Sequence, residues 1–228
     1  MSSNLNYMPS RNTRKEYREN SFYHVYNRGV EKRCIFQDDQ DYVIFLHMLK
    51  YFLLPGQKDI IHPLVGLQGY QVKRPRPMTS LYGQVELHAF CLMPNHFHLL
   101  IRQISGRGMI ELMQKILTTY SIYFNKRYQR VGHLFQGVYK AVLVDKDDYL
   151  LYITRYIHEN SLELSGMTRS DLVSYPYSSY GYYLKEKHAD WLKTDLILGF
   201  FNERQTYKDF VEGNEVNSRN ALGKLVID

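Results

Sequence analysis

Apolar and polar residues alternate along the chain in blocks that predict short strands and amphipathic helices. Strand-type runs cover residues 22–26, 84–93, 96–103 and 137–144, and helix-type runs cover 42–54, about 110–128 and 148–159. Period-two runs rich in β-branched and aromatic residues are typical of strands, and apolar residues at three- and four-residue spacing are typical of helices. The order is therefore β-α-β-β-α-β followed by one more helix.

This order of elements predicts an α+β fold. Four antiparallel strands with two helices on one face form a ferredoxin-like sheet, and the helix over 148–159 follows as an addition. Gly, Pro and basic residues dominate about 56–82, between the first helix and the second strand, which predicts an insertion. We therefore predict a flexible basic arm over 1–21, a domain over 22–160 that contains this insertion, and a C-terminal helical extension over 161–228.

Composition narrows the class of protein. The chain has 228 residues, two cysteines (Cys34 and Cys91) and a formal net charge of +6. Two cysteines without paired spacing favour neither a disulfide framework nor a thiolate zinc site, so we expect a reducing cytoplasm. No apolar run reaches the length of a membrane span, so we expect no membrane partner. The positive charge favours a polyanion, and nucleic acid fits best.

Two histidines flank a phenylalanine on the third predicted strand. His96 and His98 point to one face of a strand while Phe97 points to the other, so two imidazoles converge. Imidazole is a common ligand for divalent ions, but Mg²⁺ and Mn²⁺ also want oxygen. For a bare His-x-His motif, the plainer interpretation is a pair of structural histidines on a half-exposed strand.

The last predicted helix carries oxygen-bearing side chains at helical spacing. Tyr152, Tyr156 and Asn160 lie at i, i+4 and i+8, which places them in one stripe. If that stripe packs over the histidines, Asn160 can complete a metal site and Tyr156 can act as a nucleophile on a phosphate beside it. The alternative is a tyrosine that only fills core space, which is the expectation for nearly all of the 21 tyrosines.

Five segments, in order, resemble the REP-associated tyrosine transposases. These proteins belong to the single-tyrosine HUH transposases, the IS200-like transposases. The segments are FYHVYNRGVEKRCIFQDD at 22–39, ELHAFCLMPNHFHLLI at 86–101, GHLFQGVYKAVLV at 132–144, YLLYITRYIHEN at 149–160 and YPYSSY at 175–180. The resemblance implies His96 and His98 as metal ligands, Tyr156 as the nucleophile and Asn160 as the polar residue beside the metal. It also implies cleavage and rejoining of single-stranded or hairpin DNA through a 5′-phosphotyrosine, with Mg²⁺ or Mn²⁺.

Basic residues gather between positions 104 and 140. Six basic residues stand there against one acid, Glu111, and account for +5 of the net charge. We predict a track for phosphates along this segment, with Tyr120, Tyr123, Tyr128 and Phe135 as platforms for unpaired bases. A second group near the first strand is expected to contact the hairpin foot or guide bases. The predicted DNA-binding residues are Asn27, Arg28, Lys32, Arg33, Arg107, Lys115, Lys126, Arg127, Arg130 and Lys140.

Other functions stay open on the sequence alone. The same fold and charge would suit a non-catalytic module that binds DNA or RNA hairpins, because a ferredoxin-like sheet with aromatic side chains also binds RNA. The sequence leaves open whether the protein is a monomer or a homodimer, and it does not identify a target sequence. His88 and His158 are expected to be structural rather than metal ligands.

Overall fold

The computed structural model describes residues 17–56, 79–201 and 203–213. Most of the predicted arm over 1–21 and of the predicted insertion over 56–82 lies outside these ranges. The domain boundaries therefore stay a prediction. In the described end of the predicted arm, the Tyr17 ring packs against the Tyr23 ring with a centroid distance of 4.9 Å.

In the described part of the chain, four strands form one antiparallel sheet in the order β2-β3-β1-β4. Two helices connect the strands so that the chain runs β-α-β-β-α-β. This order and topology confirm the predicted ferredoxin-like α+β fold. The elements are β1 (Ser21–Arg28), α1 (Asp39–Leu53), β2 (Val85–Met93), β3 (His96–Gln103), α2 (Gly108–Arg127) and β4 (Lys140–Val144).

Local chemistry explains where several of these elements begin and end. Helix α1 starts three residues earlier than the apolar pattern predicts, because the Asp38 side chain accepts a hydrogen bond from the Asp41 backbone and caps the helix. The backbone of Gly137 has φ +138°, a conformation that a strand cannot continue. Strand β4 consequently starts at Lys140 and not at the predicted position 137.

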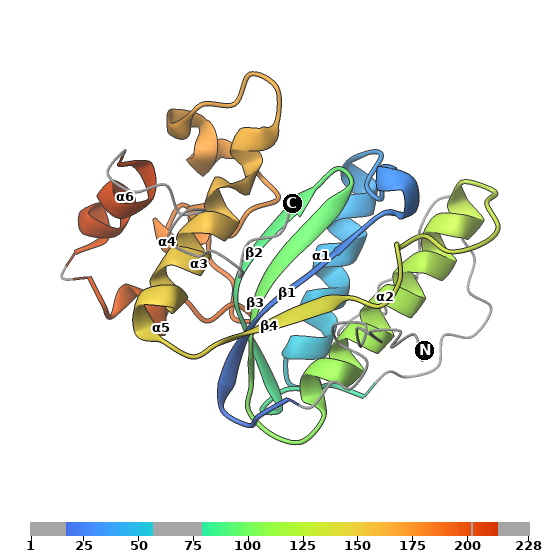
Figure 1. The fold of residues 1–228 in the computed structure, drawn as a ribbon, viewed down its shortest axis with the longest axis horizontal. Helices are drawn as coiled ribbons and strands as arrows, with labels where there is room; N and C mark the ends of the chain where they lie inside the picture. The colour runs from blue at the N-terminus through green and yellow to red at the C-terminus, as the bar shows by residue number, and fades with distance from the viewer. Residues whose placement is uncertain (1–16, 57–78, 202, 214–228) are drawn as a thin grey trace, which may run out of the picture.

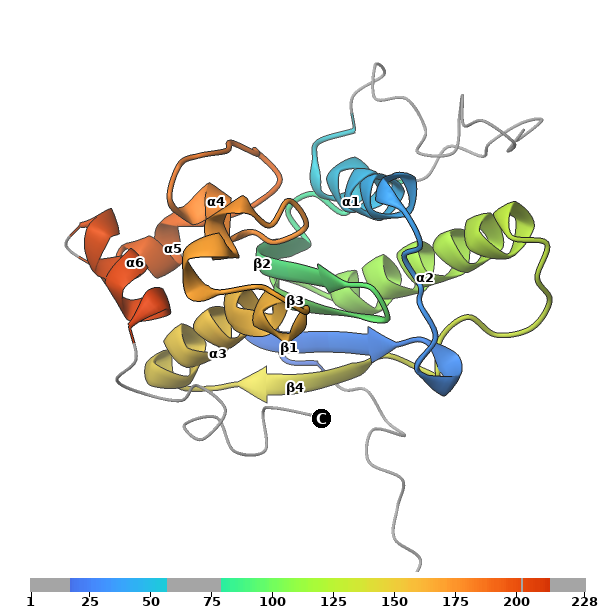
Figure 2. The ribbon, with the colours of Figure 1, turned by 90° about the horizontal axis from the view of Figure 1, so that it is seen from above.

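The two faces of the sheet have different covers. Helices α1 and α2 lie on one face, where the side chains of Phe97 and Leu99 join a large apolar core (Figures 1 and 2). Helix α3 (Asp147–Glu159) packs on the other face, where Leu100 meets Ile153 and Ile157. The odd and even residues of β3 thus enter different cores, and this alternation carries the even-numbered histidines to the α3 face.

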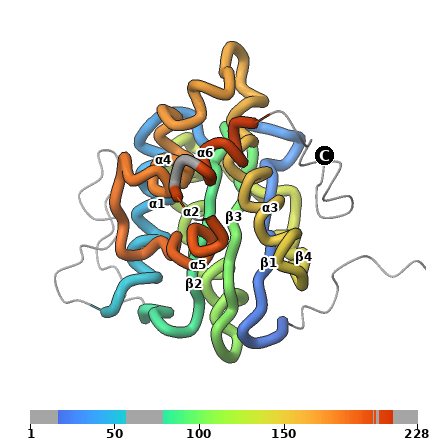
Figure 3. Tube along the Cα trace, turned by 90° about the vertical axis from the view of Figure 1, so that its left-hand side faces the viewer, coloured from blue at the N-terminus to red at the C-terminus, as the bar shows by residue number. Residues whose placement is uncertain are grey.

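Most of the chain after α3 lies on the α3 side of the sheet, whereas Trp191 and Leu192 join the apolar core on the side of α1 and α2. Figure 3, viewed from that side, shows α4 to α6 in front of the strands together with α3. Backbone hydrogen bonds join this part to β2, including one from Lys193 to Leu87 and one from Leu92 to Tyr177. The elements are two 3-10 helices (Asn160–Glu163 and Arg169–Ser174), α4 (Tyr180–Tyr183), α5 (Asp195–Leu198) and α6 (Arg204–Glu212). None of the helices in the described ranges has the length and apolar character of a membrane span.

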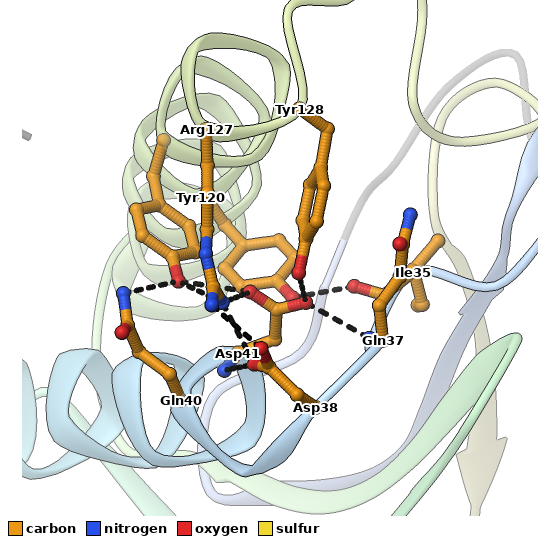
Figure 4. A network of polar contacts seen from close by, with 9 residues as sticks. Ile35, Gln37, Asp38, Gln40, Asp41, Tyr120, Arg127 and Tyr128 are labelled. Atoms are coloured by element: carbon orange, nitrogen blue, oxygen red, sulfur yellow. Dashed lines mark hydrogen bonds and ion pairs between the residues drawn. The ribbon is translucent and has the colours of Figure 1, made fainter. Parts of the chain in front are cut away.

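A polar network ties the start of α1 to the end of α2 (Figure 4). The carboxylate of Asp41 is fully buried and pairs with the Arg127 guanidinium at 2.6 Å. The hydroxyls of Tyr123 and Tyr128 each donate to the same carboxylate at 2.8 Å. Arg127 also pairs with Asp38 at 2.6 Å. A buried charge needs partners of this kind, so the network fixes the two helices relative to each other.

We predict that Arg127→Met lowers the free energy of unfolding by about 3 kcal/mol, because it leaves the buried Asp41 charge without its cation. Urea denaturation followed by circular dichroism measures the effect. Arg107→Met removes the same charge from an exposed position on the same helix and should cost less than about 0.5 kcal/mol. Equal stability of the two variants would contradict the assigned role of the network.

Candidate active site

Strand register places five chemically active side chains on the α3 face of the sheet. Tyr26 on β1 pairs with His98 on β3, and Arg28 pairs with His96. On its other side, Tyr26 pairs with Lys140 on β4. Directly paired residues of antiparallel strands project to the same face. An imidazole, a phenol and an ammonium therefore form one row across the sheet, and His96 and Arg28 form the next row.

Helix α3 brings Tyr156 onto these rows. The Tyr156 ring meets the edge of His98 at a centroid distance of 5.4 Å and that of His24 at 5.8 Å. The packing of Ile153 and Ile157 into the second core turns this side of α3 toward the sheet. The structure thus brings the sequence-predicted nucleophile to the sequence-predicted histidines, which are 58 and 60 positions away in the chain.

Asn160 follows Tyr156 by one turn at the end of α3. Its amide nitrogen donates to the Tyr156 carbonyl at 2.7 Å, which holds the side chain in place. Its oxygen Oδ1 is buried and accepts no hydrogen bond from the described residues. Burial lowers the pKa of His96, and the nearby Asn160 and Glu163 side chains act in the opposite direction. Asn160 therefore presents an unused acceptor in the surroundings of His96.

The hydrogen bonds of Asn95 define the protonation of His96. The Asn95 amide nitrogen donates to the Lys32 carbonyl, so its oxygen Oδ1 faces the ring and accepts from His96 Nδ1 at 2.6 Å. An amide oxygen can only accept, so Nδ1 carries the proton and the lone pair is left on Nε2. Because burial lowers its pKa, His96 is neutral at pH 7. A neutral imidazole held this way is suited to bind a cation.

His24 was missed by sequence reasoning. Its Nε2 lies 2.8 Å from His98 Nδ1, and the two rings stack at a centroid distance of 5.1 Å. A signal was present, since His24 lies two residues before Tyr26 and so shares its face of β1. The pairing of β1 with β3, which decides that this face meets the histidines, was not available from periodicity.

Tyr26 was missed for the same reason. Its ring stacks near His98 at 5.9 Å and lies beneath the Lys140 ammonium at 5.7 Å. Its hydroxyl is buried and has no hydrogen-bond partner among the described residues. Burial, and next the neighbouring Tyr156, raise the pKa of Tyr26 to about 12. The phenol therefore keeps its proton at neutral pH and is a hydrogen-bond donor.

The donor set fits a divalent ion. The imidazoles of His96 and His98 lie side by side, and the unused amide oxygen of Asn160 lies near them. In the described ranges, no three residues of the types His, Cys, Asp and Glu form a metal site by themselves, so the amide oxygen is needed as the third ligand. An amide oxygen supplies the hard ligand that Mg²⁺ or Mn²⁺ prefers. His96, His98 and Asn160 are thus suited to the metal expected from the sequence.

A cleft adjoins the histidines. It is lined by residues of β1, β3 and the α2–β4 segment: Tyr26, Asn27, Arg28, His96, His98, Gln136, Val138 and Lys140. No carboxylate of the described residues forms an ion pair with Arg28 or Lys140, so both cations are available to an anion. The Asn27 amide is used within the protein, because it donates to the Gly137 carbonyl at 3.1 Å and accepts from the Arg28 backbone.

The other sequence-predicted DNA contacts lie outside this cleft. Four of them are engaged within the protein: Arg33 with Glu31, Lys115 with Glu111, Arg127 with Asp38 and Asp41, and Arg130 with Asn125. Lys32, Arg107 and Lys126 are exposed. The contact of all seven residues with DNA stays a prediction. The Arg127 charge is already paired with two carboxylates, so it would attract a phosphate weakly.

Three of the four predicted aromatic platforms, Tyr120, Tyr123 and Phe135, are buried, so for these the prediction is wrong. Tyr120 and Tyr123 are fully buried, and Phe135 is 7% exposed. The Tyr128 hydroxyl binds the Asp41 carboxylate. Tyr120 and Tyr123 fill the core between α2 and the sheet because they lie on the buried face of the helix. Helical spacing is the same for a stacking surface and for a core.

Residues 78–160 match the family described as "Transposase IS200 like". This confirms, over a segment that contains His96, His98, Tyr156 and Asn160, the resemblance found in the motifs. No curated protein matches the chain.

A solved structure is also similar to the chain. It is described as the structure of a REP-associated tyrosine transposase bound to a REP hairpin. The identity is 13% and the TM-score is 0.49, and the match covers 79% of this chain and 92% of that chain.

His158 lies on α3 two residues after Tyr156 but faces away from the site. Its two ring nitrogens bind the Ser179 hydroxyl at 2.7 Å and the Tyr207 hydroxyl at 2.8 Å. It is fully buried, and burial lowers its pKa to about 3. His158 is therefore a structural histidine, as expected, and it joins α3 to the C-terminal elements.

We predict that His158 makes the fold sensitive to acid. Because the pKa is lower in the folded than in the unfolded state, the unfolded state binds the proton more readily. Stability is complete above about pH 6.5 and falls by about 1.4 kcal/mol per pH unit below it, toward pH 3. Urea titrations between pH 4 and 8 measure this slope. His158→Gln should flatten it, whereas the exposed His188→Gln should leave it unchanged.

Proposed function

We propose that the protein is a DNA strand transferase that cleaves and rejoins single-stranded or hairpin DNA, with Tyr156 as the nucleophile. The observation that carries the proposal is the packing of the Tyr156 ring against His98, in a face of the sheet that also presents His96 and Asn160. A phenol beside two imidazoles, next to a cationic cleft, suits attack on a phosphodiester. The match of residues 78–160 to the IS200-like transposases supports the same chemistry.

The proposed reaction is a transesterification. The Tyr156 oxygen forms a bond to phosphorus, the bond from phosphorus to the 3′ oxygen breaks, and the phenolic proton is balanced by the proton that the 3′ oxygen gains. The products are a 5′-phosphotyrosine and a free 3′ hydroxyl. Since one ester replaces another, the bond energy is retained and a 3′ hydroxyl can reverse the step.

His96, His98 and Asn160 would hold Mg²⁺ or Mn²⁺. When bound, the ion draws charge from the non-bridging phosphate oxygens and so favours attack by an anion. Around it, His24 fixes the orientation of His98 and Asn95 fixes that of His96 through single hydrogen bonds. A hydrogen bond to one ring nitrogen of a histidine leaves the other nitrogen available to bind the metal.

The cleft beside the histidines is the proposed path of the DNA strand. Arg28 and Lys140 would contact backbone phosphates, and the exposed Gln136, which lines the same cleft, would serve as a donor and acceptor for a base edge.

We predict that the wild-type protein, with Mn²⁺ and labelled hairpin DNA carrying single-stranded flanks, forms a protein–DNA adduct that resists denaturant. Tyr156→Phe should abolish it. Tyr152→Phe, which changes a half-buried phenol one turn earlier on the same helix, should retain it. Denaturing gel electrophoresis measures the adduct.

An adduct that survives Tyr156→Phe would refute the assigned nucleophile. DNA binding that is insensitive to chelator, with no adduct under any metal, would favour the non-catalytic hairpin-binding module instead. Matched RNA hairpins in the same assay decide between DNA and RNA as the substrate.

We also predict that Lys140→Gln weakens DNA binding by removing one phosphate contact. The slope of log Kd against log salt should decrease by about 1 in magnitude. Fluorescence anisotropy in a Tyr156→Phe background measures this without cleavage. Lys208→Gln removes the same charge from α6 and should leave the slope unchanged. Identical slopes for the two variants would place the strand elsewhere.

A further inference from the structure

The hydroxyl of Tyr26 differs from the other buried tyrosine hydroxyls. Among the tyrosine hydroxyls of the described residues, that of Tyr26 alone is buried without a hydrogen-bond partner. Elsewhere, Tyr183 donates to the His88 carbonyl at 2.7 Å and Tyr175 donates to the Leu92 carbonyl at 2.6 Å. Buried tyrosine hydroxyls with a structural role thus have a hydrogen-bond partner within the protein.

An unsatisfied buried hydroxyl destabilises a folded protein. Phenylalanine would fill the same space on β1 without that cost, and the residue is 7% exposed, so solvent does not compensate. A buried polar group of this kind calls for a partner that binds later. The question is which group could reach it.

The surroundings of Tyr26 identify the partner. The residue lines the cleft between His98 and Lys140, and it lies close enough to Tyr156 for the two phenols to affect each other. A phosphorus atom that Tyr156 attacks must come within about 3 to 3.5 Å of its oxygen. The non-bridging oxygens of that phosphate then enter the neighbourhood of Tyr26 as well.

We propose that Tyr26 is a further catalytic residue, whose hydroxyl donates a hydrogen bond to a non-bridging oxygen of the scissile phosphate. This inference rests on the proposed function of Tyr156. A donor fixed beside the reacting group stabilises the negative charge that develops on the phosphate oxygens during attack. Lys140, above the Tyr26 ring, adds a positive charge on the same side.

The test is the Tyr26→Phe variant in single-turnover adduct formation with saturating hairpin DNA. The rate should fall on the order of 100-fold, as for the loss of one donor to a developing oxyanion. The Kd for DNA should rise by less than about tenfold, because the hydrogen bond to the bound phosphate is weaker than the one to the charge that develops during reaction. The melting temperature should stay equal or rise, since an unsatisfied hydroxyl is removed.

Tyr183→Phe is the matched control. It removes a buried hydroxyl that has a partner, so the melting temperature should fall while the rate of adduct formation stays at the wild-type value. A fall in melting temperature for Tyr26→Phe, with a rate that follows the loss of folded protein, would show a structural role and overturn the proposal.

Sulfur substitution of the phosphate tests the contact itself. In the wild type, one diastereomer of a phosphorothioate at the scissile position should react more slowly because sulfur accepts a hydrogen bond poorly. Tyr26→Phe should reduce this sulfur effect for that diastereomer alone. Unchanged sulfur effects for both diastereomers would overturn the contact with the phosphate.

The outcomes also separate this proposal from the one on which it rests. If the wild-type protein forms no adduct with any metal, the proposed strand transfer is wrong. If the wild type and Tyr26→Phe form the adduct at the same rate and Tyr156→Phe forms none, Tyr156 stands and the role of Tyr26 is wrong.

Discussion

The packing of α3 against the open face of the sheet is the constraint on which the candidate site depends. Strands β1 and β3 can align their histidines by register alone, but the phenol comes from a separate element. Apolar burial by Leu150, Ile153 and Ile157 presses α3 onto β3, and each such side chain contributes about 1.5 to 3 kcal/mol. Because Tyr156 shares the helix with these residues, the energy that holds α3 also positions the proposed nucleophile.

Hydrogen bonds then fix the orientation of the site histidines and the ring nitrogen that carries the proton. A buried histidine can be neutral in either of two tautomers, and only one of them leaves the nitrogen that faces the site free. Asn95, in the turn between β2 and β3, determines this choice for His96, while His24 restricts the ring of His98 from the neighbouring strand. The site is therefore arranged by residues that would not themselves touch a substrate.

The sequence contains much of the fold and part of the site. Alternation in β3 and helical spacing in α3 were sufficient to predict that His96 and His98 share a face and that Tyr156 and Asn160 share a stripe. His24 and Tyr26 were not found, because their importance arises from the pairing of β1 with β3 and β4. Local periodicity carries no information on which strands become neighbours, and the aromatic residues of α2 failed for a related reason, since a core and a stacking surface have the same spacing.

Whether a basic residue is paired with a carboxylate depends on which of the two faces of the sheet it lies near. Helix α2 has its buried face toward the first core, so Arg127 is near Asp38 and Asp41, which satisfy its charge. Arg28 and Lys140 lie on strands whose α3 face is left open at one end, and the described residues that line the cleft there include no carboxylate. A polyanion is attracted to charge that the protein has not already neutralised. The direction proposed for the approach of a DNA strand is thus decided less by where cations occur in the sequence than by which of them the fold leaves without a carboxylate partner.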